Sequence, residues 1–335
     1  MKKFLSIVMV VAMVLSLAAC GSKTETEVAT TAPAVKGLTA EERAKEFITV
    51  GTGPTSGVYY PIGGAIATAL ADYGYKTSAE ATAASGANIT NIDKGDAEIA
   101  IAMQDAVMQA YNGTDSYTGK QVPSLRAMMR LWPNYVQLVT IKQTGITKVE
   151  DLRGKRVGVG AANSGVEINA RQILNAYGIT YNDIKPDYLA YGEAIDAMKN
   201  GQCDAVFVTS GLPNATVTAL GVEYDMVVVP INGAGADKLV KENPIYAKGI
   251  IPANTYNNTT DVDSVFVYNI LLCNANLEDK VVYDMMEGIF ANIKTIKASH
   301  NTADKNIDIT TGSNDLVLPL HPGAEQFWKD QGYIK

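Results

Sequence analysis

Val50-Gly51-Thr52-Gly53-Pro54-Thr55-Ser56-Gly57-Val58 is repeated with variation as Val157-Gly158-Val159-Gly160-Ala161-Ala162-Asn163-Ser164-Gly165-Val166. Each copy is typical of an apolar strand, a glycine turn and the start of a helix. A second shared element follows, Lys94-Gly95-Asp96-Ala97-Glu98-Ile99 in the first copy and Asn200-Gly201-Gln202-Cys203-Asp204-Ala205 in the second. Both place an acid three residues after a glycine and then return to a strand. We therefore predict two similar lobes.

The glycine turns indicate what the lobes could hold. The first N–H groups of a helix have no partner within the helix, and its dipole favours negative charge at that end. Two helix N-termini that face each other across a cleft would therefore hold a small anion. The predicted site lies between the lobes.

Alternation of strand-like and helix-like segments predicts the fold class. Short apolar runs such as Phe47–Val50 and Ile99–Ala102 alternate with Ala-rich stretches such as Tyr59–Tyr73. This order is typical of an α/β fold with a mainly parallel sheet in each lobe, flanked by helices. We expect lobe I at residues 46–142 plus 265–335 and lobe II at 143–264.

Two segments are expected to cross between the lobes. Tyr135–Lys142 is a strand-like run that leads into lobe II, and Ser264–Leu272 reads as the buried strand that returns. Two hinge strands would let the lobes close without unfolding.

Three local patterns give sharper predictions. Thr147 and Glu150 predict a capping box before a short helix. Gly192–Asn200 reads as a helix that Gly201 ends. Leu277–Lys297 reads as one long amphipathic helix.

The N-terminus predicts export and a lipid anchor. Met1-Lys2-Lys3 is a positive start, Phe4 to Leu17 is apolar, and Leu17-Ala18-Ala19-Cys20 resembles the lipobox of a bacterial lipoprotein. We expect a signal peptide at 1–19, acylation of Cys20 and a disordered tether at 20–45. The alternative is an ordinary membrane helix, for which the apolar stretch is short. The protein would be extracytoplasmic and anchored to the cell membrane.

Composition excludes several classes. The 335 residues are 47% hydrophobic and carry a net charge of −7 without basic clusters, which is a poor match for nucleic acid. Cys203 and Cys273 are expected to be free thiols rather than a disulfide. The two histidines show no zinc spacing, so no metal and no cofactor are expected. We expect a monomer.

The glycine turns also allow two enzyme hypotheses, a dinucleotide-binding enzyme and a serine hydrolase. A dinucleotide motif needs glycine where Ser56 and Asn163 stand, and neither copy ends like a phosphate loop. Ser164 on a strand-to-helix turn could be a hydrolase nucleophile with His321 as its base. Helix N-capping is the commoner role for Ser56 and Ser164.

Several motifs occur in order after the tether. They are Val50-Gly51-Thr52-Gly53 with Gly57-Val58-Tyr59-Tyr60-Pro61, Asp151-Leu152-Arg153-Gly154-Lys155-Arg156-Val157 with Asn163-Ser164-Gly165, Ile251-Pro252-Ala253-Asn254-Thr255-Tyr256, and His321-Pro322-Gly323-Ala324. In this order the chain resembles the TAXI family of solute receptors for TRAP transporters. Pro54-Thr55, Glu98 and Gly86-Ala87 depart from the family pattern.

The resemblance implies a two-lobed periplasmic-binding-protein fold, type II-like, and a protein that is not an enzyme. It would capture a glutamate-like amino acid or a dicarboxylate and deliver it to TRAP membrane subunits. The ligand-binding residues that it implies are Gly53, Ser56, Gly57, Tyr59, Ser85, Asn88, Gln104, Asn163, Ser164 and Gly165, with Thr209 to Pro213 as a further wall. The alternatives are a binding protein that serves an ATP-driven permease or a sensor, and a secreted serine hydrolase.

Overall fold

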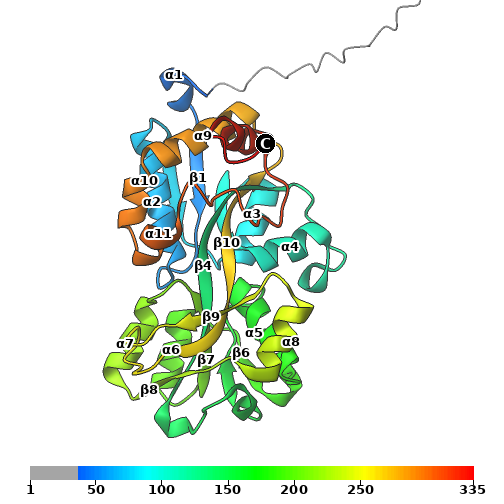
Figure 1. Cartoon of the computed structure of the whole chain (residues 1–335), viewed down its shortest axis with the longest axis vertical. Helices are drawn as coiled ribbons and strands as arrows, with labels where there is room; N and C mark the ends of the chain where they lie inside the picture. The colour runs from blue at the N-terminus through cyan, green and yellow to red at the C-terminus, as the bar shows by residue number, and fades with distance from the viewer. Residues whose placement is uncertain (1–36) are drawn as a thin grey trace, which may run out of the picture. The chain divides into compact units, whose positions relative to one another are not determined.

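The computed structural model describes residues 37–335 (Figure 1). The predicted signal peptide at 1–19, Cys20 and most of the predicted tether lie outside the described residues. The last part of the tether region differs from the prediction, because Ala40–Arg43 form helix α1. Thr39 caps this helix, and Leu38 is buried against the fold.

The described residues form one mixed sheet with the order β2-β1-β3-β10-β4-β7-β5-β6, to which β8 adds on β4 and β9 on β10. The strands are β1 Phe47–Gly51, β2 Lys76–Glu80, β3 Ile99–Met103, β4 Leu125–Ile141, β5 Arg156–Gly158, β6 Lys185–Asp187, β7 Ala205–Ser210, β8 Met226–Val229, β9 Ala247–Ile251 and β10 Val262–Asn274.

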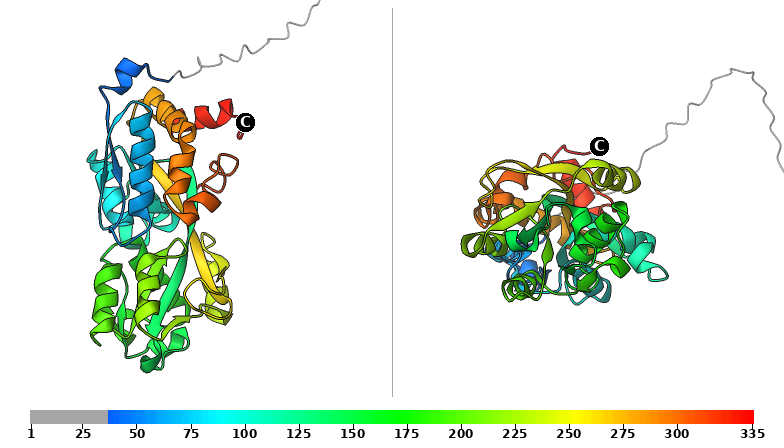
Figure 2. Two further views of the ribbon diagram at one scale, coloured as in Figure 1. Left: turned by 90° about the vertical axis from the view of Figure 1, so that its left-hand side faces the viewer. Right: turned by 90° about the horizontal axis from the view of Figure 1, so that it is seen from below.

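Helices flank this sheet in two groups. We use lobe I for the elements around β1–β3 and lobe II for those around β5–β7. Lobe I holds α2 Tyr59–Asp72, α3 Ser85–Lys94, α4 Gln104–Asn112, α9 Asp279–Ala291, α10 Ile293–Ala298, α11 Asn301–Asn306 and α12 Pro322–Asp330. Lobe II holds α5 Gly165–Ala176, α6 Tyr191–Lys199, α7 Ala215–Glu223 and α8 Gly233–Glu242. Figure 2 shows the C-terminal helices beside the earliest elements of lobe I.

Two long strands join the lobes. β4 pairs with β10 in lobe I and then with β7 and β8 in lobe II, and β10 continues to pair with β9. Both predicted hinge strands are therefore confirmed. The sheets predicted for the separate lobes form one hydrogen-bonded ladder, because β4 and β10 run through both. The two-lobed α/β fold is also confirmed.

The repeated acid has the same structural role in both copies. Glu98 accepts a hydrogen bond from the backbone N–H of Thr49 at 2.7 Å, and Asp204 accepts one from that of Arg156 at 2.8 Å. Thr49 lies in β1 and Arg156 begins β5. Each acid therefore secures the first strand of its copy at the point where the later strand begins.

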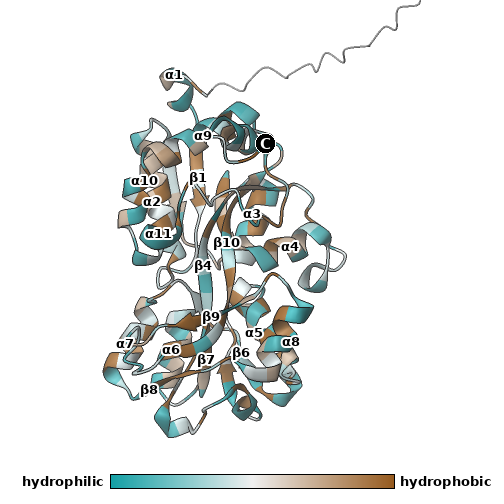
Figure 3. Ribbon diagram, in the orientation of Figure 1, coloured by the Kyte–Doolittle hydropathy of each residue, from teal (hydrophilic) through white to brown (hydrophobic). Residues whose placement is uncertain are grey.

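The core follows from the burial of the central strands. Every residue of β3 and β7 is buried, as expected for strands covered by helices on both faces. Figure 3 shows apolar residues along the sheet and mixed polarity on the helices. Cys203 and Cys273 are buried free cysteines, as predicted.

Two local predictions need correction. The expected helix Leu277–Lys297 is broken at Asn292, whose side-chain amide donates to the carbonyl oxygens of Ala69 and Gly288. At Thr147 the cap is formed by Asp151 rather than Glu150, and its carboxylate accepts from the Thr147 N–H and hydroxyl, each at 3.0 Å. These bonds lower the pKa of Asp151. The helix ended by Gly201 is confirmed, and that glycine has φ +68°.

Among the described residues, none of the helices has the length and apolar character that crossing a lipid bilayer requires.

Candidate functional site

The two glycine turns meet a third element, the start of α3, where lobe I faces lobe II. A Cβ atom added to Gly86 in α3 would lie 2.2 Å from the carbonyl oxygen of Asn163 in the β5–α5 turn. One added to Gly165 would lie 2.9 Å from the Ser85 Oγ. The N-termini of α3 and α5 therefore abut, and both glycines permit the approach because they lack a side chain.

Two small cavities lie between the lobes at this contact. They share Pro54, Ala84, Val166 and Tyr191. The first is also lined by Ala83, Gly160, Ala161, Ser164, Leu189 and Ala190, and the second by Gly57, Val58, Tyr59, Met103, Thr209 and Ser210. Each has a volume of about 20 Å³, enough for roughly one water molecule. The lobes are closed on each other.

Helix starts border these cavities: Val58 and Tyr59 at the start of α2, Ala84 before α3 and Val166 in the first turn of α5 are lining residues. No side chain caps α2 or α3, and the first N–H groups of both helices have no acceptor among the described residues. Ser164 caps α5 and accepts from the N–H of Glu167 at 3.2 Å. Neither Lys nor Arg is among the described residues that line the cavities. The groups at this site that favour an anion are therefore the helix starts, through their N–H groups and dipoles.

Thr209 is an unsatisfied polar group in this lining. Its Oγ1 is buried and has no hydrogen-bond partner among the described residues. The Thr209 carbonyl oxygen accepts from the hydroxyl of Tyr191 at 2.7 Å, which holds the Tyr191 ring against the cavity. Burial raises the pKa of Tyr191, so its hydroxyl stays protonated. A buried group of this kind is a natural partner for a bound ligand.

Tyr59 connects the first turn to both hinge strands. Its hydroxyl donates to Asn269 of β10, and Asn134 of β4 donates to the same Asn269 oxygen at 3.0 Å. Trp132 donates to Asn134 at 2.9 Å. Burial raises the pKa of Tyr59 well above its usual range. The Tyr59 ring lines the cavity, whereas its hydroxyl is already hydrogen-bonded to Asn269 of the hinge strand β10.

The structure brings most of the predicted site residues to the contact between the lobes. Gly57, Tyr59 and Ser164 line the cavities, and Ser85, Asn163 and Gly165 form the abutting helix starts. Gly53 packs beside Tyr59 and Ala84. Ser56 lies at the rim, where its carbonyl oxygen accepts from the Thr216 hydroxyl of lobe II at 3.3 Å.

Asn88 and Gln104 have structural partners instead. The Asn88 amide donates to the carbonyl oxygens of Thr52 and Ile101, and its oxygen accepts from the Thr82 hydroxyl. Gln104 accepts from the N–H of Val317 at 3.2 Å. Both side chains are buried within lobe I, and these bonds hold the turns in place.

Sequence reasoning missed the apolar part of the lining. Ala84, Met103, Val166, Leu189 and Tyr191 carry no polar motif that would have singled them out. The sequence did offer a signal for Tyr191: it is the first residue of α6, as Tyr59 is the first residue of α2.

Ser164 and His321 do not form a hydrolase pair. Ser164 caps α5, while His321 caps α12 and accepts from the N–H of Gly323 at 3.2 Å. The other ring nitrogen of His321 lies 3.1 Å from the carbonyl oxygen of Leu277. Desolvation lowers the pKa of this histidine. The two residues have separate sets of partners.

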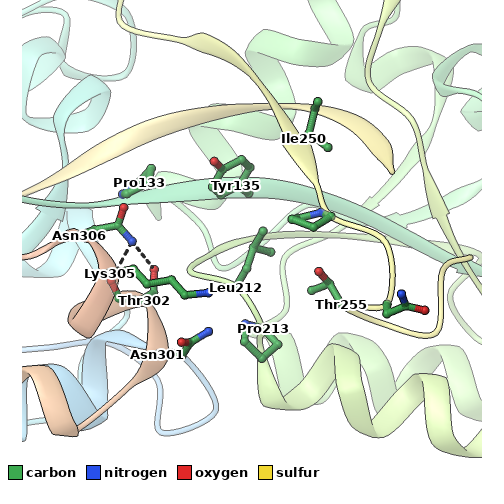
Figure 4. A pocket seen from close by; sticks show the side chains of 12 residues that line it. Pro133, Tyr135, Leu212, Pro213, Ile250, Thr255, Asn301, Thr302, Lys305 and Asn306 are labelled. Carbon is green, nitrogen blue, oxygen red and sulfur yellow. Dashed lines mark hydrogen bonds between the residues drawn. The ribbon is translucent and has the colours of Figure 1, made fainter. Parts of the chain in front are cut away.

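A larger cavity of about 450 Å³ lies elsewhere, beside the hinge (Figure 4). It is lined by Pro133 and Tyr135 of β4, by Leu212 and Pro213, and by residues of α11 and of the loop after β9. Side chains alternate along a strand, so Pro133 and Tyr135 face away from the side where Asn134 meets Tyr59. Part of the predicted wall, Leu212 and Pro213, thus faces this cavity, whereas Thr209 and Ser210 line the cleft.

The fold, with its enclosed contact between two hinged lobes, is that of the two-lobed periplasmic binding proteins. The chain belongs to the NMT1-like family, whose sequence pattern matches residues 50–332. The narrower resemblance to the TAXI family stays a prediction.

Solved structures share the fold at low sequence identity. PhnD1 from Prochlorococcus marinus, in complex with methylphosphonate, has a TM-score of 0.53 at 11% identity over 86% of this chain and 99% of that one. A substrate-binding protein of an ABC uptake transporter from Streptococcus pneumoniae, with bound histidine, has a TM-score of 0.50 at 17% identity over 79% and 97%. A phosphonate-transporter binding protein from Pseudomonas aeruginosa has a TM-score of 0.50 at 14% identity over 86% and 85%.

Proposed function

We propose that this protein is an extracytoplasmic solute receptor that captures a small organic anion between its lobes and delivers it to a membrane transporter. One observation carries the proposal: uncapped helix starts of lobe I and the start of α5 in lobe II converge on shared cavities. A receptor needs such a site, because a ligand that touches both lobes favours the closed form.

The energetics are adequate without a cationic side chain. Each hydrogen bond to a charged ligand is worth roughly 1.5–3 kcal/mol, and a helix dipole adds roughly 0.3–1 kcal/mol. Because the closed cavities each hold about 20 Å³, a solute enters only when the lobes separate. A dicarboxylate or glutamate is larger than either closed cavity, so the loaded form would close less tightly than the form described here, with the solute between N–H groups, hydroxyls and apolar walls.

The ligand that we propose is a dicarboxylate or a glutamate-like amino acid, as the TAXI resemblance implies. The donors at the helix starts fit carboxylate groups. L-Glutamate and 2-oxoglutarate form an informative pair, since they differ mainly at the ammonium group.

A thermal-shift panel tests the anion site. Dicarboxylates and acidic amino acids are expected to raise the melting temperature in a concentration-dependent way, because a ligand that binds only the folded state stabilises it. Neutral amino acids and sugars serve as controls. If only uncharged compounds stabilise the protein, the anion proposal is wrong.

Thr209→Val is expected to weaken ligand binding roughly tenfold, because the hydroxyl would supply one hydrogen bond to a charged ligand. Folding stability should stay nearly unchanged, since this hydroxyl has no partner among the described residues. Thr140→Val is the matched control, because the Thr140 hydroxyl bonds to the Asp204 carbonyl oxygen away from the cleft. That variant should lose stability and keep its affinity. Calorimetry measures the ligand affinity of both variants, and urea unfolding measures their stability. If Thr209→Val binds the ligand as tightly as the wild type does, the Thr209 hydroxyl does not contact the ligand.

The membrane partner that we propose is the set of integral membrane subunits of a TRAP transporter. An ATP-driven permease is the second candidate, because the structural neighbours from Streptococcus pneumoniae and Pseudomonas aeruginosa belong to ABC systems. Uptake into vesicles distinguishes them, since a TRAP system responds to an ion gradient and an ABC system to ATP.

We also propose the anchor and the domain boundaries. Cys20 would carry lipid and hold the protein on the outer side of the cell membrane. Lobe I would comprise 46–142 with 265–335, and lobe II 143–264. The strands β4 and β10, which cross between the lobes, support these limits.

A further inference from the structure

Asp105 is a carboxyl group buried where the two lobes meet beside the cleft. It lies in α4 of lobe I with no exposed surface. Its Oδ2 accepts from the side-chain amide of Asn169 in α5 at 2.6 Å and lies 2.9 Å from the hydroxyl of Tyr246, which precedes β9. Both partners belong to lobe II. The burial of Asp105 therefore depends on closure of the lobes.

Asp105 has no ion-pair partner within residues 37–335. Arg171 of α5 is the cation on this side, and it pairs with Asp115 at 2.7 Å and with Glu167 at 3.2 Å. The other titratable groups around Asp105 are Tyr59 of α2, Tyr117 of the turn Asp115–Tyr117 and Tyr246. All three are phenols whose pKa burial raises. An ionised Asp105 would thus be a buried anion without a cation. The N–H groups of Asp105 and Ala106 in the first turn of α4 favour the ionised form, but desolvation outweighs them.

The hydrogen bonds around Tyr246 also favour a protonated Asp105. The Tyr246 oxygen makes two oxygen–oxygen contacts, one to Asp105 at 2.9 Å and one to Gln172 Oε1 at 2.7 Å. Each contact needs a proton between its oxygens, and the tyrosine hydroxyl supplies one. Both Asn169 amide protons are already used, toward Asp105 and Tyr246. The amide nitrogen of Gln172 faces Asn243 Oδ1 at 3.4 Å, so its oxygen faces Tyr246. In this orientation a proton on Asp105 supplies the second contact, with Tyr246 donating to Gln172.

We propose that the lobes close with Asp105 protonated, so that closure around the solute takes up a proton in mildly acidic conditions. This inference rests on the proposed receptor function, since it concerns the same movement. Desolvation raises the pKa of Asp105 to about 6 from an ordinary value of 3.8. A group whose pKa is raised on closure stabilises the closed form below its open-state pKa, and this stabilisation is lost as the pH rises through 6. The closed-to-open ratio should therefore be roughly tenfold larger at pH 5 than at pH 8.

A distance measurement on the ligand-free protein tests this. Spin labels at Lys94→Cys in α3 and Lys241→Cys in α8 report the separation of the lobes, because both positions are exposed. The background is Cys20→Ser, and Cys203 and Cys273 are buried and so protected from the label. The closed population should grow between pH 8 and pH 5. In Asp105→Asn, which mimics the neutral carboxyl, this growth should disappear.

Three outcomes would overturn the proposal. The first is a wild-type distance that does not change with pH, and the second is an Asp105→Asn variant that keeps the full pH dependence. The third is closure that follows sodium concentration rather than pH, since the Oδ1 atoms of Asp105 and Asn169, which have no hydrogen-bond partner in the described part of the chain, would then hold a cation. A failed ligand panel refutes the receptor proposal separately, because the distance measurement needs no ligand.

Discussion

Gly86→Ala is expected to weaken solute binding roughly 10- to 100-fold while leaving the fold at least as stable as before. The added Cβ would lie 2.2 Å from the Asn163 carbonyl oxygen, a backbone atom of the other lobe. Overpacking of this kind costs roughly 1–3 kcal/mol, and here the cost falls on the closed form alone. In the open form the alanine meets no such neighbour. An alanine in a helix also stabilises it by roughly 1 kcal/mol relative to glycine.

Gly64→Ala is the matched control for this variant. Gly64 also lies in a helix of lobe I, and a Cβ there meets no atom of the described residues within 4 Å. Both variants should melt at or above the wild-type temperature, and only Gly86→Ala should lose affinity for a ligand identified by the thermal-shift panel. Equal affinities for the two variants would mean that α3 and the β5–α5 turn do not meet in the bound state.

Arg43→Met should destabilise the protein by roughly 3–5 kcal/mol, because it leaves a buried carboxylate without its cation. Arg43 holds Asp284 through Nε at 2.7 Å and Nη2 at 2.8 Å, and the Asp284 side chain has no exposed surface. Asp284 raises the pKa of the guanidinium, which therefore stays charged. Tyr75 and the Leu38 N–H also donate to Asp284, so the carboxylate keeps part of its support.

Urea unfolding measures this loss, and Lys329→Met supplies the comparison. Lys329 pairs with Glu325 on an exposed face of α12, where an ion pair contributes roughly 0.3–0.5 kcal/mol. A double variant, Arg43→Met with Asp284→Leu, should regain stability relative to Arg43→Met, because it removes the unpaired charge. If Arg43→Met and Lys329→Met had the same free energy of unfolding, the buried Arg43–Asp284 pair would stabilise the protein no more than an exposed ion pair does.

Local patterns predicted the framework of the fold. The repeated turns, the acids Glu98 and Asp204 and the crossing strands are all readable from neighbouring residues, and each has the predicted place. The cap predicted at Ser164 is confirmed, whereas the cap predicted at Ser56 is wrong, because α2 begins only at Tyr59 and has no side-chain cap. Such features depend on a few consecutive residues, and for this reason the sequence reveals them.

Local sequence patterns could not predict which residues line the cavities. Tyr59 bonds to Asn269, 210 positions later in the chain, and Asn88 has the residue type of a ligand contact although its amide is fully used inside lobe I. Ala84 has φ +64°, an uncommon conformation for a residue with a side chain, and nothing near it in the sequence predicts this. These features arise only when distant strands and helices pack together.

A hydrogen bond from the Leu38 N–H to Asp284 holds the start of the described chain against lobe I. Asp284 belongs to α9, so the described chain begins from the surface of lobe I (Figure 1). If Cys20 carries lipid as proposed, the pull of the membrane acts on this lobe alone. Lobe II would then be the lobe that moves relative to the membrane as the protein opens and closes, and the lipid anchor would not restrain this movement.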